Sequence, residues 1–216
     1  MSRTESVWAV GRLTLQPTVM GLTRLRVYGA ERVPLEGGIV VAANHFSWID
    51  PPSLGAACPR PVYFMAKFEA HRVPGLGQLL RSFGAFAVRR GESDRDAVRT
   101  MREIVSGGNA LGMFVEGTRQ KSGIPGKAQA GAAMVALNES VPILPAAIHG
   151  SQHWRLGNFK PVSIAWGEPM TFGGLPRGGR GYKEASVEVE RKLLELWQWL
   201  VDIHDLDRPR DATPPR

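Results

Sequence analysis

From residue 39 onward, short apolar runs alternate with longer stretches of helical character, and this alternation restricts the fold more than any other feature of the chain. The runs are rich in Val, Ile and Phe, and several are apolar on both faces, as strands buried within a sheet are. The sequence therefore predicts an α/β domain. The runs occupy residues 39–43, 62–66, 85–88, 110–115, 141–148 and 162–166.

Three of the intervening stretches carry the signals of helices. Residues 94–106 follow Ser93, which is placed to cap the first turn, and a Gly-Gly pair ends the run. Residues 128–138 form a second candidate. The longest, residues 183–204, presents one broad apolar face and predicts a helix that packs on the core.

Two stretches have the composition of mobile segments. Residues 172–182 are rich in glycine, and residues 207–216 are rich in proline and charge, so we expect the latter to form a disordered tail. No internal repeat and no second domain is evident. We therefore expect a single domain over residues 1–206.

Residues 1–28 interleave apolar side chains with arginine, and two interpretations of this segment are open. Its longest uncharged stretch, residues 13–23, is shorter than the roughly 18 residues that a spanning helix needs. The opening also lacks the basic cluster and cleavage site of a signal peptide. The segment is expected to be either an amphipathic helix at a membrane interface or a helix packed on the core and bent at Pro17.

The charge balance indicates a preference for anionic partners. The chain has 27 Lys and Arg against 20 Asp and Glu, a formal net charge of +7, which favours phosphates, coenzyme A, acidic lipids or nucleic acid. The basic residues are scattered and the aromatic residues lie in core-like runs, so we expect no nucleic acid. The single cysteine, Cys58, excludes an intrachain disulfide and a multi-cysteine zinc site. We expect no metal.

Polar and charged side chains follow the apolar runs at the points where the predicted strands end. Asn44 and His45 follow the first run, Lys67 the second, a pair of arginines the third and Glu116 the fourth. In an open α/β sheet, ligands bind beyond the carboxyl ends of the strands. The sequence therefore predicts a site at this edge.

His45 and Asp50 are spaced as a catalytic dyad would be. The carboxylate would accept the Nδ1 proton and fix the tautomer, which leaves Nε2 as a general base for a hydroxyl. At this point the simpler alternative also stands: a histidine that ends a strand, with Asp50 beginning a helix before Pro51 and Pro52. No Gly-x-Ser-x-Gly motif occurs, which argues against a serine hydrolase.

Four ordered blocks of the chain resemble those of the lysophosphatidate acyltransferase family. The blocks are NHFSWID (44–50), GAFAVRRG (84–91), FVEGTR (114–119) and VPILP (141–145), and the resemblance covers residues 25–170. Four blocks in the right order, each after a predicted strand, form a specific signal. The resemblance implies a single α/β domain with a mixed, mostly central β-sheet flanked by helices.

The family pattern implies roles for individual residues. In that family the histidine of the first block is the catalytic base and its aspartate supports it, so the resemblance implies these roles for His45 and Asp50. The second and third blocks bind the phosphate of the acceptor. The implied acceptor contacts are Arg90, Glu116, Gly117, Thr118 and Arg119, with Lys67 and Lys127 as looser candidates.

The resemblance also implies an activity: transfer of a fatty acyl group from acyl-CoA or acyl-carrier protein to the hydroxyl of a lysophosphatidate-like acceptor in phospholipid biosynthesis, without a cofactor. Basic and apolar groups near the N-terminus are expected to attach the enzyme peripherally to an anionic membrane surface, on the cytoplasmic face. Two alternatives stay open. One is an acyltransferase for another lysophospholipid or a glycolipid, and the other is a catalytically silent lipid-binding homologue.

Overall fold

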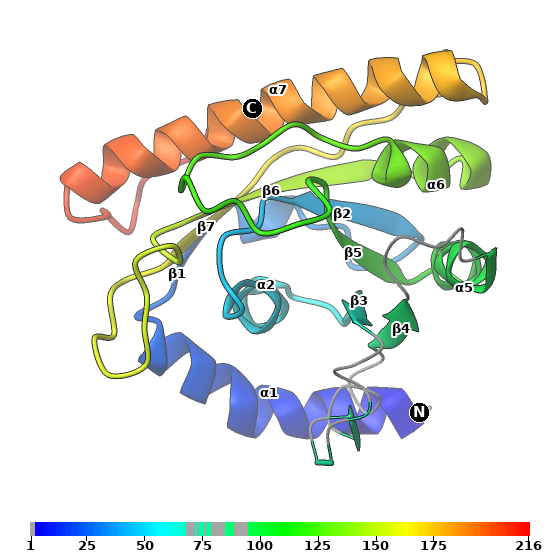
Figure 1. The fold of residues 1–216 in the computed structure, drawn as a ribbon. Helices are drawn as coiled ribbons and strands as arrows, with labels where there is room; N and C mark the ends of the chain where they lie inside the picture. The colour runs from blue at the N-terminus through cyan, green and yellow to red at the C-terminus, as the bar shows by residue number, and fades with distance from the viewer. Residues whose placement is uncertain (1–2, 68–71, 73, 76, 79–84, 89–94) are drawn as a thin grey trace.

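The computed structural model describes residues 3–67, 72, 74–75, 77–78, 85–88 and 95–216. Within these residues the chain forms seven strands, which are β1 (Arg26–Tyr28), β2 (Ile39–Ala43), β3 (Val62–Lys67), β4 (Phe86–Val88), β5 (Ala110–Phe114), β6 (Ile143–His149) and β7 (Ser163–Trp166). They make one sheet in the order β1-β7-β6-β2-β5-β3-β4 (Figure 1).

Strand β2 lies at the centre of the sheet and is parallel to both of its neighbours. Ala43, its last residue, is paired in register with Phe114, the last residue of β5, and with Ala146 of β6. Strands β3 and β4 continue the parallel arrangement beyond β5, whereas β7 is antiparallel to β6. The sheet is therefore mixed and mostly parallel, which confirms the α/β prediction. The carboxyl ends of its central strands share one edge.

Helices cover both faces of this sheet, and the side chains of β2 show why. Val41 belongs to a buried cluster with side chains of α1 (Arg3–Leu22) and α2 (Asp50–Ala57). Its neighbours Val40 and Ala42 belong to a second cluster with side chains of α5 (Arg95–Ser106), α6 (Gly131–Glu139) and α7 (Gly179–Asp205). In Figure 1 the first pair of helices lies below the sheet, and α6 and α7 lie above it. A short 3₁₀ helix lies at Ala30–Arg32.

The six strands expected from the apolar runs are all present, each within two residues of its expected limits. One strand was not expected, and one expected helix begins earlier in the chain than the sequence indicated. Strand β1 has only three residues and owes its pairing to β7, which follows more than a hundred residues later in the chain. Helix α7 begins at Gly179 rather than at residue 183, because the glycine-rich segment before it turns directly into the helix.

The N-terminal helix α1 is packed against α2 in its second half. Gln16 donates from Nε2 to the carbonyl of Ala56 at 2.8 Å, and Val19 and Met20 contact the buried cluster on this side of the sheet. Leu13, by contrast, is 81% exposed. Among the residues that the structure describes, no helix combines the length and the apolar character needed to cross a bilayer.

The C-terminal tail lies against the domain, contrary to the expectation of disorder. The guanidinium of Arg32 donates to the carbonyls of Pro214 and Pro215, and Arg208 is buried and donates to the carbonyl of Arg24 at 2.9 Å. A composition rich in proline and charge does not reveal such bonds, because the acceptors are backbone carbonyls and each donor lies far from its acceptor in sequence.

Candidate active site

His45 and Asp50 form a buried dyad where β2 leads into α2. His45 Nδ1 lies 2.8 Å from Asp50 Oδ2, and that oxygen also accepts the backbone N–H groups of Phe46 and Ser47 at 2.7 Å. Asp50 is fully buried, and His45 is 8% exposed. The carboxylate therefore orients the imidazole through Nδ1, and Nε2 is left for a substrate proton.

A row of aromatic rings supports the imidazole. Phe114, which ends β5, stacks on His45 with 4.1 Å between ring centroids and 20° between planes. Phe64 of β3 stacks on Phe114 in turn, with 6.0 Å between centroids. The three rings come from neighbouring strands: His45 follows β2, Phe114 ends β5 and Phe64 lies within β3. The sheet register thus sets the plane of the His45 ring, in addition to its hydrogen bond with Asp50.

Glu116 joins the segment after β2 to the loop after β5. Its Oε2 accepts the backbone N–H of His45 at 2.7 Å, and its Oε1 accepts that of Gly126 at 3.0 Å. Burial raises the pKa of this carboxyl to about 7, although the two backbone hydrogen bonds oppose the rise. The N–H of Gln120 also donates to the carbonyl of His45 at 2.7 Å, so both backbone groups of His45 are held by the same segment.

The turn that follows Glu116 exposes the remaining residues of the third block. Gly117 has φ of +72°, a conformation that favours glycine, and its N–H donates to the carbonyl of Phe114 at 3.0 Å. Thr118 and Arg119 are exposed beyond this turn, and Lys127 is exposed where the loop returns toward α6. A hydroxyl and two cations are thereby available to an anion at this edge of the sheet.

The structure thus brings together most of the residues expected from the sequence. His45, Asp50 and Glu116 are in direct contact, and the turn from Gly117 to Arg119 adjoins them. Lys67 ends β3, and its side chain lies outside the described part of the structure. Arg90 also lies outside the described residues.

Two supporting residues were not assigned a role from the sequence. Asn44 is fully buried and bridges the backbone of Ile148: its Nδ2 donates to the carbonyl at 2.9 Å, and its Oδ1 accepts the N–H at 2.7 Å. It therefore fastens the end of β2 to β6, directly before His45. Phe114 is the second; the sequence marks it by its place at the end of a buried strand and as the first residue of the third block.

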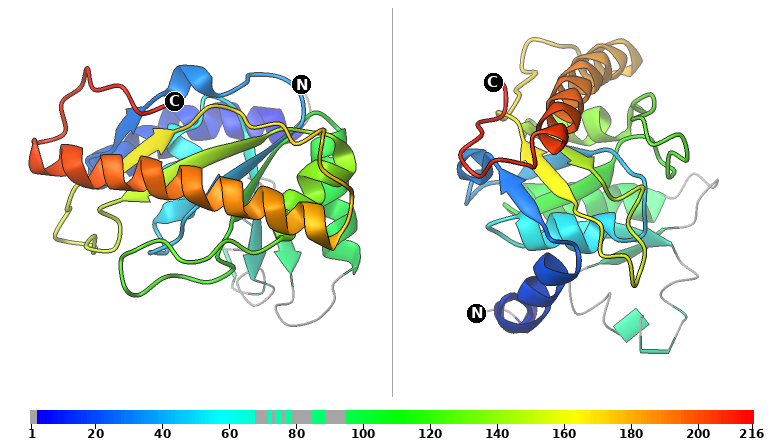
Figure 2. Two further views of the ribbon diagram at one scale, coloured as in Figure 1. Left: turned by 90° about the horizontal axis from the view of Figure 1, so that it is seen from above. Right: turned by 90° about the vertical axis from the view of Figure 1, so that its left-hand side faces the viewer.

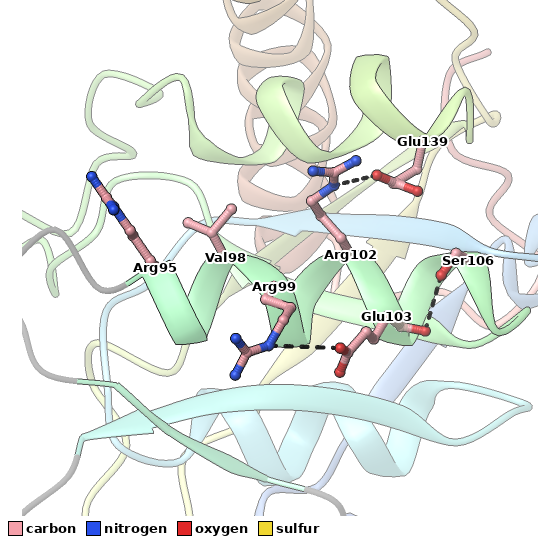
Figure 3. A pocket seen from close by; sticks show the side chains of 7 residues that line it. All are labelled: Arg95, Val98, Arg99, Arg102, Glu103, Ser106 and Glu139. Carbon is pink, nitrogen blue, oxygen red and sulfur yellow. Dashed lines mark hydrogen bonds and ion pairs between the residues drawn. The ribbon is translucent and has the colours of Figure 1, made fainter.

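A separate hollow of about 340 Å³ lies on the surface of α5 and contains none of the expected site residues (Figure 3). Two of its three arginines are paired with neighbouring acids: Arg99 Nη2 lies 2.9 Å from Asp96 Oδ1, and Arg102 Nε lies 2.5 Å from Glu139 Oε1. Exposed pairs of this kind contribute little stability, and they leave few free cations for a ligand. We therefore place the active site at the dyad.

Comparisons with known proteins agree with this geometry. A family model described as Acyltransferase matches residues 24–149, which is more than half of the chain and includes His45, Asp50 and Glu116. The 1-acyl-sn-glycerol-3-phosphate acyltransferase of Bacillus subtilis is 30% identical over 183 residues, which cover 80% of this chain and 91% of that protein. The chain belongs to the lysophosphatidate acyltransferase family, as its four blocks indicated, and is an acyltransferase enzyme.

Other relatives differ in the acceptor for which they are named and in the share of each chain that the match covers. The 1-acyl-sn-glycerol-3-phosphate acyltransferase of Borreliella burgdorferi is 26% identical over 62% of this chain and 55% of that protein. A lyso-ornithine lipid O-acyltransferase of Pseudomonas aeruginosa is 38% identical, but over 35% of this chain and 29% of its own. The crystal structure of the acyltransferase PlsC from Thermotoga maritima superposes with a TM-score of 0.70 at 23% identity, over 94% of this chain and 84% of that one, and shares the fold.

Proposed function

We propose that this enzyme transfers a fatty acyl group from the thioester of acyl-CoA or acyl-carrier protein to the free hydroxyl of a lysophosphatidate-like acceptor, a step of phospholipid biosynthesis. The observation that carries the proposal is the 2.8 Å contact between His45 Nδ1 and Asp50 Oδ2, buried at the carboxyl edge of the sheet. The B. subtilis relative, which matches most of this chain, is named for a phosphate-bearing acceptor of this kind.

In the proposed reaction His45 acts first as base and then as acid. Nε2 takes the proton of the acceptor hydroxyl while the hydroxyl oxygen attacks the thioester carbonyl. Asp50 stabilises the imidazolium that forms. The tetrahedral intermediate then collapses with cleavage of the carbon–sulfur bond. The thiolate leaves and receives the proton from Nε2. The products are the new ester and a free thiol, and no acyl-enzyme is needed.

We assign the acceptor phosphate to the loop that follows Glu116. Arg119 offers a planar fork that matches two phosphate oxygens, with Thr118, the backbone of Gly117 and Lys127 as further contacts. All four residues belong to the loop that Glu116 attaches to His45, which supports a phosphate site next to the base. Glu116 serves this site by holding the loop in place. By resemblance to the family, we also assign Arg90 and Lys67 to the phosphate site.

We further propose peripheral attachment to an anionic membrane at its cytoplasmic face. The formal net charge of +7 attracts such a surface. Leu13 and Leu15 of α1 are both exposed, which supports the interfacial interpretation for this part of the helix alongside the packing of its second half.

The proposal is tested by thiol release from palmitoyl-CoA by the purified protein, with lysophosphatidate and with other lyso-lipids. Release that depends on lysophosphatidate and is lost in His45→Ala supports it, with His153→Ala as the control, since His153 is exposed and is not part of the dyad. Release only with another lyso-lipid assigns a different acceptor, for which lyso-ornithine lipid is the first to try. No release with acyl-CoA or acyl-carrier protein indicates a silent lipid-binding homologue.

A further inference from the structure

Four large apolar side chains are exposed on the segments that surround the dyad. Trp48 follows His45 and is 59% exposed, and Ile124, in the loop after β5, is 55% exposed. Leu156 and Phe159, in the loop between β6 and β7, are 75% and 41% exposed. Large apolar groups gathered on neighbouring segments, unlike single ones scattered over a surface, indicate an interaction site.

Contacts between the segments show that these side chains share one side of the molecule. Trp48 packs edge-on against the buried Trp154, with 5.3 Å between ring centroids, so the segment after His45 touches the loop between β6 and β7. A Cβ at Gly123 would lie 3.3 Å from the side chain of Gln152, so the loop after β5 touches it as well. Both loops project from the same side of the sheet in Figures 1 and 2. We call residues 48, 117–127 and 150–161 the active-site rim.

The charge of the rim is entirely positive. Residues 117–127 and 150–161 contain no Asp or Glu. They contain five Lys or Arg, and all five are exposed: Arg119, Lys121, Lys127, Arg155 and Lys160. Apolar side chains interleaved with cations are the pattern that binds the interface of an anionic bilayer, where the former enter the headgroup region and the latter meet phosphates.

The loop between β6 and β7 is built to present its apolar side chains outward. Trp154 anchors it through a hydrogen bond from Nε1 to the carbonyl of Leu22 at 3.0 Å. At its tip, Asn158 Oδ1 accepts the backbone N–H groups of Arg155 at 2.9 Å and of Lys160 at 3.1 Å. Phe159 has φ of +47°, which is costly for an aromatic residue and persists only where the surroundings impose it. The backbone conformation that carries this exposed ring is therefore held by the loop.

We propose that the active-site rim docks directly on an anionic lipid bilayer, with Leu156 and Phe159 as its main apolar contacts and Arg155 and Lys160 facing lipid phosphates. This rests on the proposed function, since it assumes that the acceptor is a membrane lipid. An acceptor with its acyl chain in the bilayer then reaches His45 without leaving the lipid. An acidic carrier protein would match the charge, but the four exposed apolar side chains stand on three separate segments of the chain, and such a dispersed set favours a bilayer.

The test is co-sedimentation of the full chain with vesicles of phosphatidylcholine, with and without phosphatidylglycerol. In Leu156→Ser/Phe159→Ser we expect binding to the anionic vesicles to fall about tenfold or more, because two apolar side chains no longer enter the interface. The matched control is Leu35→Ser/Leu206→Ser, which changes two exposed leucines outside the rim and is expected to bind as the native chain does. Unchanged melting temperatures confirm that both double variants are folded.

Activity measurements separate this proposal from the acyl-transfer reaction. With short-chain acyl donor and acceptor that stay dissolved as monomers, the rim variant is expected to release thiol at the native rate; with acceptor in vesicles it is expected to be slower. Unchanged vesicle binding in the rim variant, with loss of binding in Leu13→Ser/Leu15→Ser, would show that α1 alone docks. Native vesicle binding with selective loss of activity on acyl-carrier protein would assign the rim to that protein. Absence of thiol release from the native chain affects only the proposed function, since vesicle binding is measured without it.

Discussion

The carboxylate of Glu116 holds the backbone of His45, whose N–H it binds at 2.7 Å. Its other oxygen binds the N–H of Gly126 at 3.0 Å, so one buried side chain fixes the catalytic segment and the proposed phosphate loop relative to each other. The proposed base and the proposed acceptor site are thus parts of one hydrogen-bonded unit.

Glu116→Gln is expected to destabilise the protein and to slow the reaction. An amide side chain has one acceptor oxygen and one donor nitrogen, so one of the two backbone N–H groups is left facing a donor. A buried N–H without a partner costs about 1–3 kcal/mol. Urea unfolding and kcat measure the two effects, and Glu184→Gln on the exposed surface of α7 is the control. Native stability together with native kcat would show that these two bonds contribute nothing.

Replacement of the dyad residues is expected to affect kcat in a graded way. His45→Ala removes the base and is expected to lower kcat by a factor on the order of 10²–10⁴. Asp50→Asn keeps an oxygen that can accept from Nδ1 but removes the charge that stabilises the imidazolium, so a smaller loss is expected. Steady-state kinetics at saturating acceptor gives both values. An Asp50→Asn enzyme as slow as His45→Ala would contradict this division of roles.

Arg119→Ala is expected to raise the KM for phosphate-bearing acceptors, because a charge-assisted bidentate contact is lost. The KM for acceptors without a phosphate should equal that of the native enzyme. Arg180→Ala, which removes an exposed arginine near the start of α7, supplies the control for the change in net charge. An equal loss on both kinds of acceptor would remove Arg119 from the phosphate site.

Gly112→Ala is expected to disturb the ring row that supports His45. A Cβ at Gly112 would lie 2.3 Å from Phe64 Cε1, so Phe64 must move, and Phe64 stacks on the Phe114 ring that supports the imidazole. Overpacking of this kind typically costs about 1–3 kcal/mol. The melting temperature and kcat should both fall. In Gly174→Ala, where a Cβ has open space, both should equal those of the native protein.

The fold and the dyad could be predicted because both depend on short-range patterns. Strands buried on both faces appear as apolar runs, and the residue after each run lies at the carboxyl edge of a parallel sheet, which is where His45 and Glu116 lie. The spacing of His45 and Asp50 is also local, since one turn after β2 leads directly into α2.

The supporting contacts could not be predicted, because each joins distant parts of the chain. Asn44 binds the backbone of Ile148 across 104 positions, and Arg32 binds the carbonyl of Pro214 across 182. Neither a backbone carbonyl nor its partner has a distinctive sequence pattern. The direction of the Glu116 carboxylate toward the His45 N–H likewise depends on the register of β2 and β5.

Acidification below neutral pH is expected to destabilise the protein through two half-buried histidines, His149 at the end of β6 and His204 near the C-terminal end of α7. Burial lowers the pKa of His149 to about 4 and that of His204 to about 3, and the two rings lie 4.6 Å apart. In the unfolded chain the pKa of each histidine is about 6.5. As the pH falls below that value, the unfolded chain binds protons that the folded chain does not, so the free energy of unfolding decreases until the folded pKa values are reached.

The measurement is urea unfolding at a series of pH values between neutrality and about pH 5, the range in which His149 and His204 gain protons in the unfolded chain but not in the folded one. Glu116, whose pKa burial raises to about 7, gains its proton in the folded chain over the same range and offsets part of the decrease. His149→Gln/His204→Gln is expected to flatten the decrease, whatever its own stability at neutral pH. His153→Gln should keep most of it, because burial of the other two rings, rather than the nearby charge of the exposed His153, is the largest cause of their lowered pKa values. A native chain whose stability is constant over this range would contradict the shifts. A double variant whose free energy of unfolding decreases on acidification as steeply as that of the native chain would also contradict them.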